Sequence, residues 1–179
     1  MIFNPLYLKD AYLINTEKKI DNRGYFSRFF CKSNFGEMGL ETHWQQMNTS
    51  FNKYKGTVRG LHFRSYQLDE SKLVRCVRGA IWDVIVDLRK DSSTFGKWYG
   101  TQLNDKNLSM IYVPKGFAHG FQTLMDNVEV FYLNSELYNP EFEMGLTATD
   151  SYVNINWPQS ITVQSERDLN LPSFKELFQ

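Results

Sequence analysis

Short runs rich in β-branched and aromatic residues recur along the whole chain, separated by clusters of Gly, Asn, Asp and Pro. Such runs are typical of β-strands, and the residues between them favour turns. No stretch keeps helical periodicity for more than about three turns, so an alternating βαβ fold is not expected. The pattern predicts an all-β sandwich or barrel with a few short helices.

The run from 80 to 88 is the predicted strand whose faces are most informative. Side chains alternate along a strand, so Ile81, Asp83, Ile85 and Asp87 should share one face. Acidic side chains between isoleucines indicate a face that is partly buried yet polar, as inside a small ligand-binding barrel. A solvated edge face would explain the same alternation. Other elements are predicted as strands at 6–15, 25–30, 44–51, 72–77, 110–113 and 128–133, and as short helices at 33–40 and from the capping box at 173–176.

The composition is that of one domain spanning residues 1–179, which is long enough to bury a sizeable core. The 20 basic and 20 acidic residues give a formal net charge of zero, which argues against a general nucleic-acid binder. No apolar run approaches the roughly 18 residues of a membrane span, and residues 1–5 lack the features of a signal peptide. Cys31 and Cys76 form no CxxC pair and are interpreted as buried structural thiols, so a reducing, cytoplasmic setting is expected.

The segment 56–63, with Lys72 just beyond it, gathers residues that can carry out chemistry. The imidazole of His62 can accept a proton near neutral pH. The guanidinium of Arg59 can bind a phosphate, and the ammonium of Lys72 can stabilise a developing oxyanion. The three together suggest proton abstraction from a phosphorylated carbonyl compound. An ordinary β-hairpin with a structural histidine and two surface cations would explain the same residues.

The spacing of Arg59 and His62 sets a geometric condition on this hypothesis. Residues three apart on a regular strand point to opposite faces. Either Gly60 marks a bulge or kink, or Arg59 still belongs to the preceding turn. Without one of these, the two side chains could not share a pocket.

A series of short motifs follows in an order and spacing that resemble a known family. They are Asp21-x-Arg23-Gly24-x-Phe26, Gln46-x-Asn48, Arg59-Gly60-Leu61-His62, Lys72-Leu73-Val74, Gly79-x-x-x-Asp83-Val84, Val86-Asp87-Leu88-Arg89, Pro114-x-Gly116-Phe117-Ala118-His119-Gly120-Phe121, Tyr132 and Trp157-Pro158. The chain resembles the dTDP-4-dehydrorhamnose 3,5-epimerases of the cupin superfamily, from about residue 8 to about residue 172.

The resemblance implies a cupin-like jelly roll, a double-stranded β-helix, that forms a homodimer by exchanging N-terminal strands. It implies inversion at C3, C5 or both of a 4-keto-6-deoxyhexose carried on a nucleoside diphosphate. The expected conversion is dTDP-4-dehydro-6-deoxy-D-glucose to dTDP-4-dehydro-L-rhamnose, in the synthesis of deoxysugars for cell-surface polysaccharides. No cofactor is implied, because the C4 ketone already acidifies the adjacent C–H bonds.

The resemblance also assigns roles to residues by motif position. His62 would remove the α-proton, and Asp168 would hydrogen-bond its imidazole and fix the tautomer. Lys72 would stabilise the enolate oxygen at C4. Tyr132 would return a proton from the opposite face of the ring. Arg23, Gln46, Asn48 and Arg59 would bind the nucleotide diphosphate, Arg23 reaching the site across the dimer in one arrangement, and Phe26, Asp83, His119 and Tyr138 would line the pocket.

Two positions depart from the commonest family pattern. Arg64 stands where the family usually has glutamine, and the loop 65–71 replaces a proline-rich one. An added cation near the pocket could change the sugar, the nucleotide or the number of centres inverted. Relatives that invert only C3 or only C5, on dTDP-, CDP- or GDP-linked sugars, share the same residues.

Two other functions remain open from the sequence. A metal-dependent cupin would need a cluster of histidine and carboxylate ligands, and this chain has only His43, His62 and His119, with no His-x-His pair. A non-catalytic sugar-nucleotide-binding module would need no acid–base set such as His62 with Tyr132. We therefore expect no metal site and an active enzyme.

Overall fold

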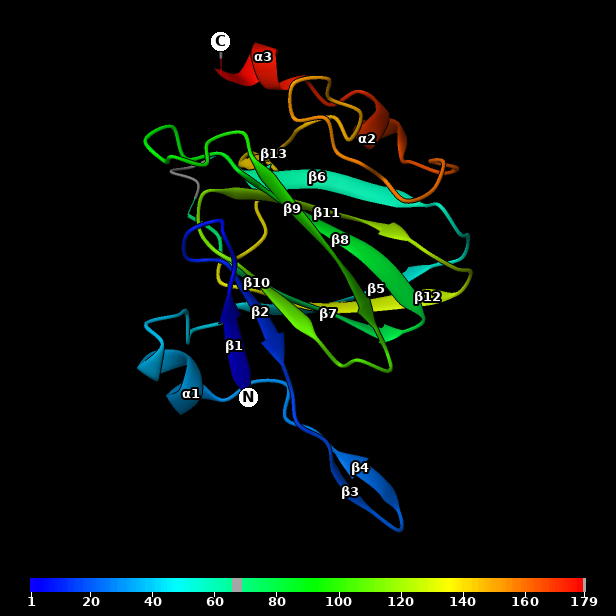
Figure 1. Ribbon diagram of the computed structural model, residues 1–179. Helices are drawn as coiled ribbons and strands as arrows, with labels where there is room; N and C mark the ends of the chain where they lie inside the picture. Colours follow the sequence, from blue (N-terminus) through cyan, green and yellow to red (C-terminus); the bar gives the residue numbers. More distant parts are fainter. Residues whose placement is uncertain (66–68, 179) are drawn as a thin grey trace.

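Two β-sheets that face each other form the body of the computed structural model, which describes residues 1–65 and 69–178 (Figure 1). The six-stranded sheet consists, in spatial order, of β1 (Ile2–Pro5), β2 (Tyr12–Asn15), β10 (Met110–Val113), β7 (Lys72–Arg78), β12 (Val128–Asn134) and β5 (Gln46–Asn52). The five-stranded sheet consists of β13 (Glu143–Gly145), β6 (Val58–Arg64), β11 (Phe117–Thr123), β8 (Ala80–Asp87) and β9 (Trp98–Asn104). The smaller elements are the hairpin of β3 (Lys19–Asp21) and β4 (Gly24–Phe26) and the helices α1 (Lys32–Glu37), α2 (Glu166–Leu169) and α3 (Phe174–Phe178).

The chain crosses repeatedly from one sheet to the other. Strands β5, β7, β10 and β12 lie in the six-stranded sheet, whereas β6, β8, β11 and β13 lie in the five-stranded sheet. The strand pairs within both sheets are antiparallel. This alternation winds the chain into a double-stranded β-helix, so the predicted all-β, cupin-like jelly roll is confirmed.

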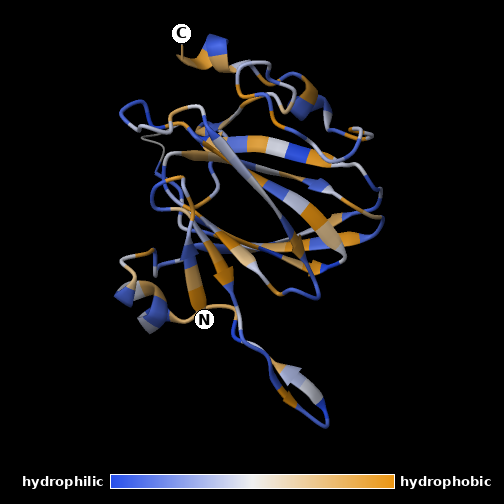
Figure 2. Cartoon of the chain, in the orientation of Figure 1, coloured by the Kyte–Doolittle hydropathy of each residue, from blue (hydrophilic) through white to orange (hydrophobic). Residues whose placement is uncertain are grey.

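Strand β8 shows how the sequence pattern builds two cores. Ile81 and Ile85 point between the sheets and pack in one cluster with Val74 of β7 and Phe121 of β11. The alternate residues, such as Val84, pack on the outer face in a second cluster with residues of the C-terminal segment. Figure 2 shows apolar residues along the strands of both sheets. Burial on both faces explains why this strand reads as almost continuously hydrophobic.

The polar residues of β8 are buried, as predicted. Asp83 is 0% exposed and lies on the same face as Ile81 and Ile85, between the sheets. Strand β8 is also internal, with β11 and β9 as neighbours. The alternative of a solvated edge face is therefore wrong.

Several predicted boundaries need correction. The strand predicted at 6–15 is strand only over β2, because residues 6–11 form a turn closed by a Leu6 N–H to Ala11 carbonyl hydrogen bond of 2.9 Å. The strand predicted at 25–30 ends at Phe26. Strand β9 was not predicted, because its Gly100 and Asn104 are residue types depleted in strands.

The two predicted helices form close to where the sequence placed them. Helix α1 ends at Glu37, before the glycine at 39, and α3 begins directly after Ser173. Ser173 and Glu176 make the reciprocal bonds of a capping box, with the Ser173 N–H donating to Glu176 Oε2 at 2.7 Å and the Glu176 N–H to Ser173 Oγ at 3.3 Å.

The two cysteines lie in different surroundings. Cys76 is fully buried in β7, and that burial raises the pKa of its thiol to about 12. Cys31 is only partly buried, and hydrogen bonding to Ser33 lowers the pKa of its thiol to about 7. The prediction of a buried structural thiol is therefore confirmed for Cys76 and wrong for Cys31.

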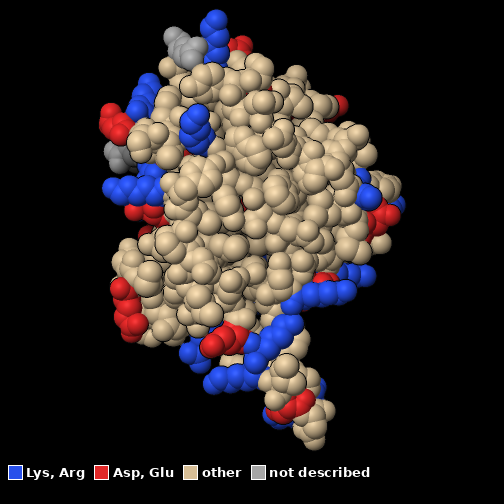
Figure 3. Space-filling model, viewed as in Figure 1, with Lys and Arg blue, Asp and Glu red and all other residues tan. Residues whose placement is uncertain are grey.

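The β3–β4 hairpin projects away from the body of the molecule (Figure 1). It exposes large apolar side chains, with Ile20 78%, Tyr25 53% and Phe26 59% exposed. On the face shown in Figure 3, Lys and Arg side chains gather where this hairpin leaves the body, while much of the remaining surface is uncharged. A projecting apolar hairpin is unusual on an isolated domain, since exposed apolar patches generally mark contact surfaces.

Candidate active site

A bulge in β6 brings Arg59 and His62 to the same face. Against the neighbouring strand β11, His62 pairs with His119 and Arg59 pairs with Phe121, so β6 carries one extra residue over this interval. Gly60 adopts a φ of +108°, and a Cβ there would lie 2.7 Å from the His119 carbonyl oxygen. The bulge required by the spacing is confirmed, and it depends on glycine.

His62 is held by a buried carboxylate from the C-terminal segment. Its Nε2 lies 2.7 Å from Asp168 Oδ1, and Asp168 is 3% exposed. The other oxygen, Oδ2, accepts from the Gly60 N–H at 3.2 Å. Ser165 caps α2 by accepting from the Asp168 N–H at 3.1 Å, which fixes the start of the helix. Three separate contacts thus orient the acid beside the imidazole.

The electrostatics of this pair select one imidazole tautomer. Burial by itself would raise the pKa of Asp168, but the hydrogen bond and charge attraction from His62, with the Gly60 N–H, hold that pKa below its ordinary value. An ionised carboxylate only accepts hydrogen bonds, so Nε2 of His62 must carry a proton and donate it. Nδ1 then keeps its lone pair and can act as a base.

Three of the four candidate catalytic side chains meet in one cavity between the sheets, and the fourth, Asp168, is not among the lining residues but contacts His62. His62 enters from β6 in the five-stranded sheet, whereas Lys72 of β7 and Tyr132 of β12 enter from the six-stranded sheet. The cavity has a volume of about 140 Å³ and is lined by Ser50, Arg59, His62, Lys72, His119, Gly120, Phe121 and Tyr132. A base and a phenol from facing sheets can address opposite faces of one ring.

A second histidine–carboxylate pair lies beside the first. His119 Nε2 is 2.9 Å from Asp83 Oδ2, and both residues are buried. Burial raises the pKa of Asp83 above its ordinary value, against the opposing attraction of His119. His119 lines the cavity, while Asp83 lies behind it and orients its ring.

The inner face of β5 contributes polar side chains next to Tyr132. Gln46, Asn48 and Ser50 alternate with exposed residues, and Asn48 pairs directly with Tyr132 across the β5–β12 ladder. Gln46 Oε1 accepts the Tyr138 N–H at 2.6 Å, although the Tyr138 side chain itself is 61% exposed. Ser50 was not predicted as a lining residue, but its two-residue spacing from Asn48 was a signal that could have found it.

Of the eight predicted binding residues, Arg59 and His119 line this cavity, whereas Gln46, Asn48, Asp83 and Tyr138 are not among its lining residues. The remaining two lie on the projecting hairpin. Arg23 is in the β3–β4 hairpin, where it pairs with Asp21 at 2.6 Å and its side chain is 85% exposed. Phe26 lies on the same hairpin and is also exposed. Within one chain, Arg23 and Phe26 therefore do not lie in the cavity that contains His62.

Arg64 does not add a cation to the cavity. Its side chain is only 10% exposed and pairs with Asp69 at 3.1 Å and Glu136 at 3.5 Å. Its guanidinium also lies 5.0 Å from the centre of the Phe142 ring. Part of the altered loop, residues 66–68, lies outside the described residues.

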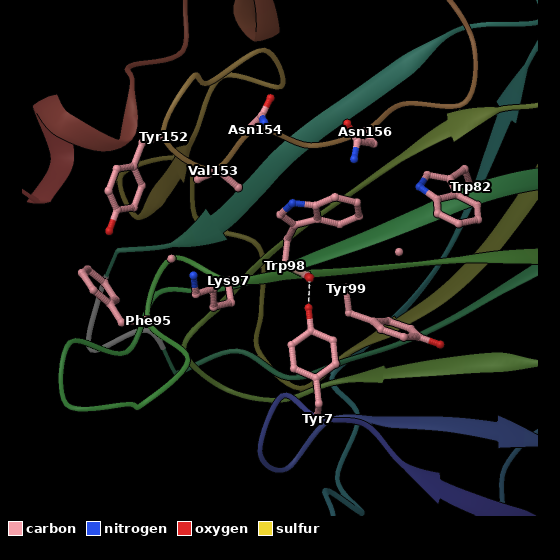
Figure 4. Close-up of a pocket in the computed structure, with 12 residues that line it drawn as sticks. Tyr7, Trp82, Phe95, Lys97, Trp98, Tyr99, Tyr152, Val153, Asn154 and Asn156 are labelled. Atoms are coloured by element: carbon pink, nitrogen blue, oxygen red, sulfur yellow. Dashed lines mark hydrogen bonds between the residues drawn. The ribbon is translucent and has the colours of Figure 1, made fainter.

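A larger hollow of about 660 Å³ lies on the outer side of β8 and β9 (Figure 4). Aromatic rings surround it, and the Tyr7 hydroxyl donates to the Trp98 carbonyl there. Trp82 and Tyr99 also face this hollow. None of the residues predicted from the motifs lines it, so its size alone does not make it the reactive site.

Two further properties concern metals and membranes. Within residues 1–65 and 69–178, no group of three or more His, Cys, Asp or Glu side chains is placed to hold a metal ion. The same part of the chain contains no helix long and apolar enough to cross a membrane.

Comparison with known proteins gives consistent results. The profile of the family described as dTDP-4-dehydrorhamnose 3,5-epimerase matches residues 5–176. The enzyme of that name from Methanothermobacter thermautotrophicus is 42% identical over 172 residues, covering 94% of this chain and 92% of the relative. A dTDP-4-dehydrorhamnose 3-epimerase from Streptomyces niveus is 37% identical over 169 residues, covering 94% and 81%.

A solved structure gives the same result for the fold. The crystal structure of the dTDP-4-dehydrorhamnose 3,5-epimerase from Elizabethkingia anophelis superposes with a TM-score of 0.94 at 40% identity, covering 98% of this chain and 97% of the other. The family profile and these relatives span nearly all of the chain, including the strands that carry His62, Lys72 and Tyr132. The chain therefore belongs to the dTDP-4-dehydrorhamnose 3,5-epimerase family, a family of isomerases.

Proposed function

We propose that the protein epimerises a dTDP-linked 4-keto-6-deoxyhexose at C3 and C5 without a cofactor, converting dTDP-4-dehydro-6-deoxy-D-glucose to dTDP-4-dehydro-L-rhamnose. The observation that carries the proposal is the meeting of His62 and Tyr132, from facing sheets, in one cavity that also contains Lys72. Inversion of a carbon needs a proton to leave one face and another to arrive on the opposite face. A base and an acid on opposite walls meet that need.

Each step of the reaction has a residue suited to it. His62 Nδ1 takes the proton from the carbon next to the ketone, and the C–H electron pair moves into an enolate with its charge on the C4 oxygen. The ammonium of Lys72 stabilises that oxygen. Tyr132 then gives its phenolic proton to the opposite face of the carbon, and solvent restores the protonation states. Asp168 keeps His62 in the tautomer that begins the cycle.

Nucleotide binding falls to the polar residues around the cavity. Arg59 is exposed at its edge and is steadied by a 2.6 Å hydrogen bond from its Nε to Asn52 Oδ1, so its guanidinium can meet a diphosphate. Gln46 and Asn48 offer amides on β5 of the facing sheet. His119 completes the pocket wall, with Asp83 behind it to orient its ring, and Tyr138 lies exposed next to Gln46.

The protein acts as a homodimer with exchanged N-terminal strands, and Arg23 and Phe26 reach the partner's site. The support is the projecting hairpin, on which both residues are exposed and remote from their own cavity. Mixing Arg23→Ala with His62→Asn protein tests this arrangement. If Arg23 acts across the dimer, mixed dimers contain one intact site and recover activity; if it acts within its own chain, no activity returns.

Residues 1–179 form one epimerase domain that works in the cytoplasm, supplying a deoxysugar for cell-surface polysaccharide. The support for a reducing compartment is that Cys31 and Cys76 are both free thiols. Inversion of C3 alone is the second candidate, favoured by the similarity to the Streptomyces niveus 3-epimerase. The cavity residues serve either outcome.

Proton NMR after incubation with dTDP-4-keto-6-deoxyglucose in heavy water tests the proposal. We expect deuterium at both C3 and C5; deuterium at C3 alone would assign the 3-epimerase activity. A binding module would retain affinity without any exchange. No exchange with this sugar or with its CDP- and GDP-linked analogues would refute the epimerase function.

A further inference from the structure

Lys72, the residue expected to stabilise the enolate, forms an ion pair with Glu70, which is not itself one of the residues that line the cavity. Its Nζ lies 2.9 Å from Glu70 Oε2, and both side chains are largely withdrawn from solvent, at 12% and 7% exposed. A carboxylate buried at this depth needs a partner, since an unpaired buried charge is costly. Glu70 stands in the loop that departs from the family pattern, and no motif pointed to it.

The second oxygen of Glu70 begins a chain of amides that crosses the sheet. Oε1 accepts from Asn134 Nδ2 at 2.8 Å, and Asn134 Oδ1 accepts from Asn48 Nδ2 at 3.2 Å. Strand pairing explains how the chain of hydrogen bonds extends from β7 to β5. Asn134 of β12, the strand between them, pairs with Lys72 of β7 on one side and with Gln46 of β5 on the other. One carboxylate thus connects the ammonium on β7 with a nucleotide-binding side chain on β5.

The direction of this chain is fixed by the chemistry of its first member. An ionised carboxylate can only accept, so Asn134 must turn its NH₂ group toward Glu70 and its oxygen toward Asn48. Asn48 must then donate one of its side-chain N–H groups to Asn134 Oδ1. Its own oxygen is left to accept a hydrogen bond from a ligand.

We propose that Glu70 is a positioning residue that acts through Lys72 and Asn48. It holds the ammonium of Lys72 in place for the enolate oxygen, and through Asn134 it sets the amide orientation of Asn48. The inference rests on the proposed epimerase function for its catalytic consequence. Its structural part, the orientation of the amides, is independent of activity.

Glu70→Gln keeps the shape of the side chain and tests both parts. A glutamine turns an NH₂ group toward either Lys72 or Asn134, where it meets another donor, so the chain must rearrange. Asp69→Asn is the matched control, because it makes the same change one residue away in a carboxylate that pairs with Arg64 instead.

The first measurement needs no substrate. In ¹H–¹⁵N spectra, the side-chain amide resonances of Asn48 and Asn134, assigned from variants that lack each amide, should both shift in Glu70→Gln and stay in place in Asp69→Asn. Unchanged Asn48 resonances in Glu70→Gln would overturn the proposal. This result stands whether or not the protein proves to be an epimerase.

The second measurement is kinetic. Loss of a charge-assisted contact to Lys72 should lower kcat by about 10- to 100-fold, with a smaller change in KM, whereas Asp69→Asn should match the wild type. A Coulomb argument alone predicts the opposite, since removing a negative charge leaves Lys72 more attractive to an enolate. An unchanged or higher kcat in Glu70→Gln, measured beside an active wild type, would therefore refute the positioning role. An inactive wild type would refute the proposed function while leaving the spectra to decide on Glu70.

Discussion

Asp168→Asn should nearly abolish proton exchange while leaving the fold and nucleotide binding intact. In the wild type, Asp168 receives the Gly60 N–H on Oδ2 and His62 Nε2 on Oδ1. The Gly60 N–H is fixed in the backbone and requires an acceptor, so the oxygen of the introduced amide must face it. The NH₂ group of the new side chain then faces His62 Nε2.

This orientation reverses the imidazole tautomer. Nε2 must now accept, so the proton moves to Nδ1, the atom that should take the proton from the sugar. The variant loses its general base in addition to a charge-assisted hydrogen bond. General-base catalysis is typically worth about 10²–10⁴-fold, and we expect a loss of kcat in that range with little change in affinity for dTDP.

Deuterium incorporation in heavy water, followed by NMR, measures the loss, and calorimetry with dTDP measures binding. Glu166→Gln is the matched control, because it makes the same acid-to-amide change on the exposed part of helix α2. A folded Asp168→Asn protein that exchanges protons within about threefold of the wild type would refute the tautomer argument, since such a change is well below the effect of losing a base.

Three further outcomes follow from the same geometry. Tyr132→Phe should remove the acid that protonates the opposite face of the carbon and lower turnover by about 10²-fold or more. Exchange of the substrate proton that His62 removes should continue. An equal loss of turnover and of this exchange would contradict the opposite-face roles of the two residues. Gly60→Ala places a Cβ 2.7 Å from the His119 carbonyl oxygen at a φ of +108°. The free energy of unfolding, measured by urea titration, should fall by about 1–3 kcal/mol. An unchanged urea midpoint would count against the bulge. The pKa of Asp168 is lower in the folded protein than in the unfolded chain, where it is about 3.9. The ionised carboxylate therefore stabilises the folded protein above that pH, and this contribution is lost as the pH falls through the pKa of the folded state. Acidification below pH ~4 should therefore destabilise the wild type more than Asp168→Asn. If the urea midpoints of the two proteins fell equally with pH, the carboxylate would be unimportant for stability.

The sequence by itself predicted much of the fold because strand alternation and turn residues are local signals. The burial of Asp83 between the sheets could be inferred from its place between Ile81 and Ile85. The capping box predicted at Ser173 forms in the structure, where the Ser173 N–H donates to Glu176. The need for a bulge near Gly60 followed from counting residues between Arg59 and His62. These inferences needed only the two-residue period of a strand and the conformational freedom of glycine.

Contacts between distant parts of the chain were decided only by the tertiary structure. The motif resemblance suggested that Asp168 serves His62, but their 2.7 Å contact depends on how the C-terminal segment folds over β6. The Glu70–Asn134–Asn48 chain depends on the register of three strands, which no local pattern encodes. The ion pairs of Arg64 with Asp69 and Glu136, and its place outside the cavity lining, were likewise decided by the tertiary structure. Alternation along a strand fixes which face a side chain takes, whereas its partners on that face are set by strand order and register, which are cooperative properties of the whole sheet.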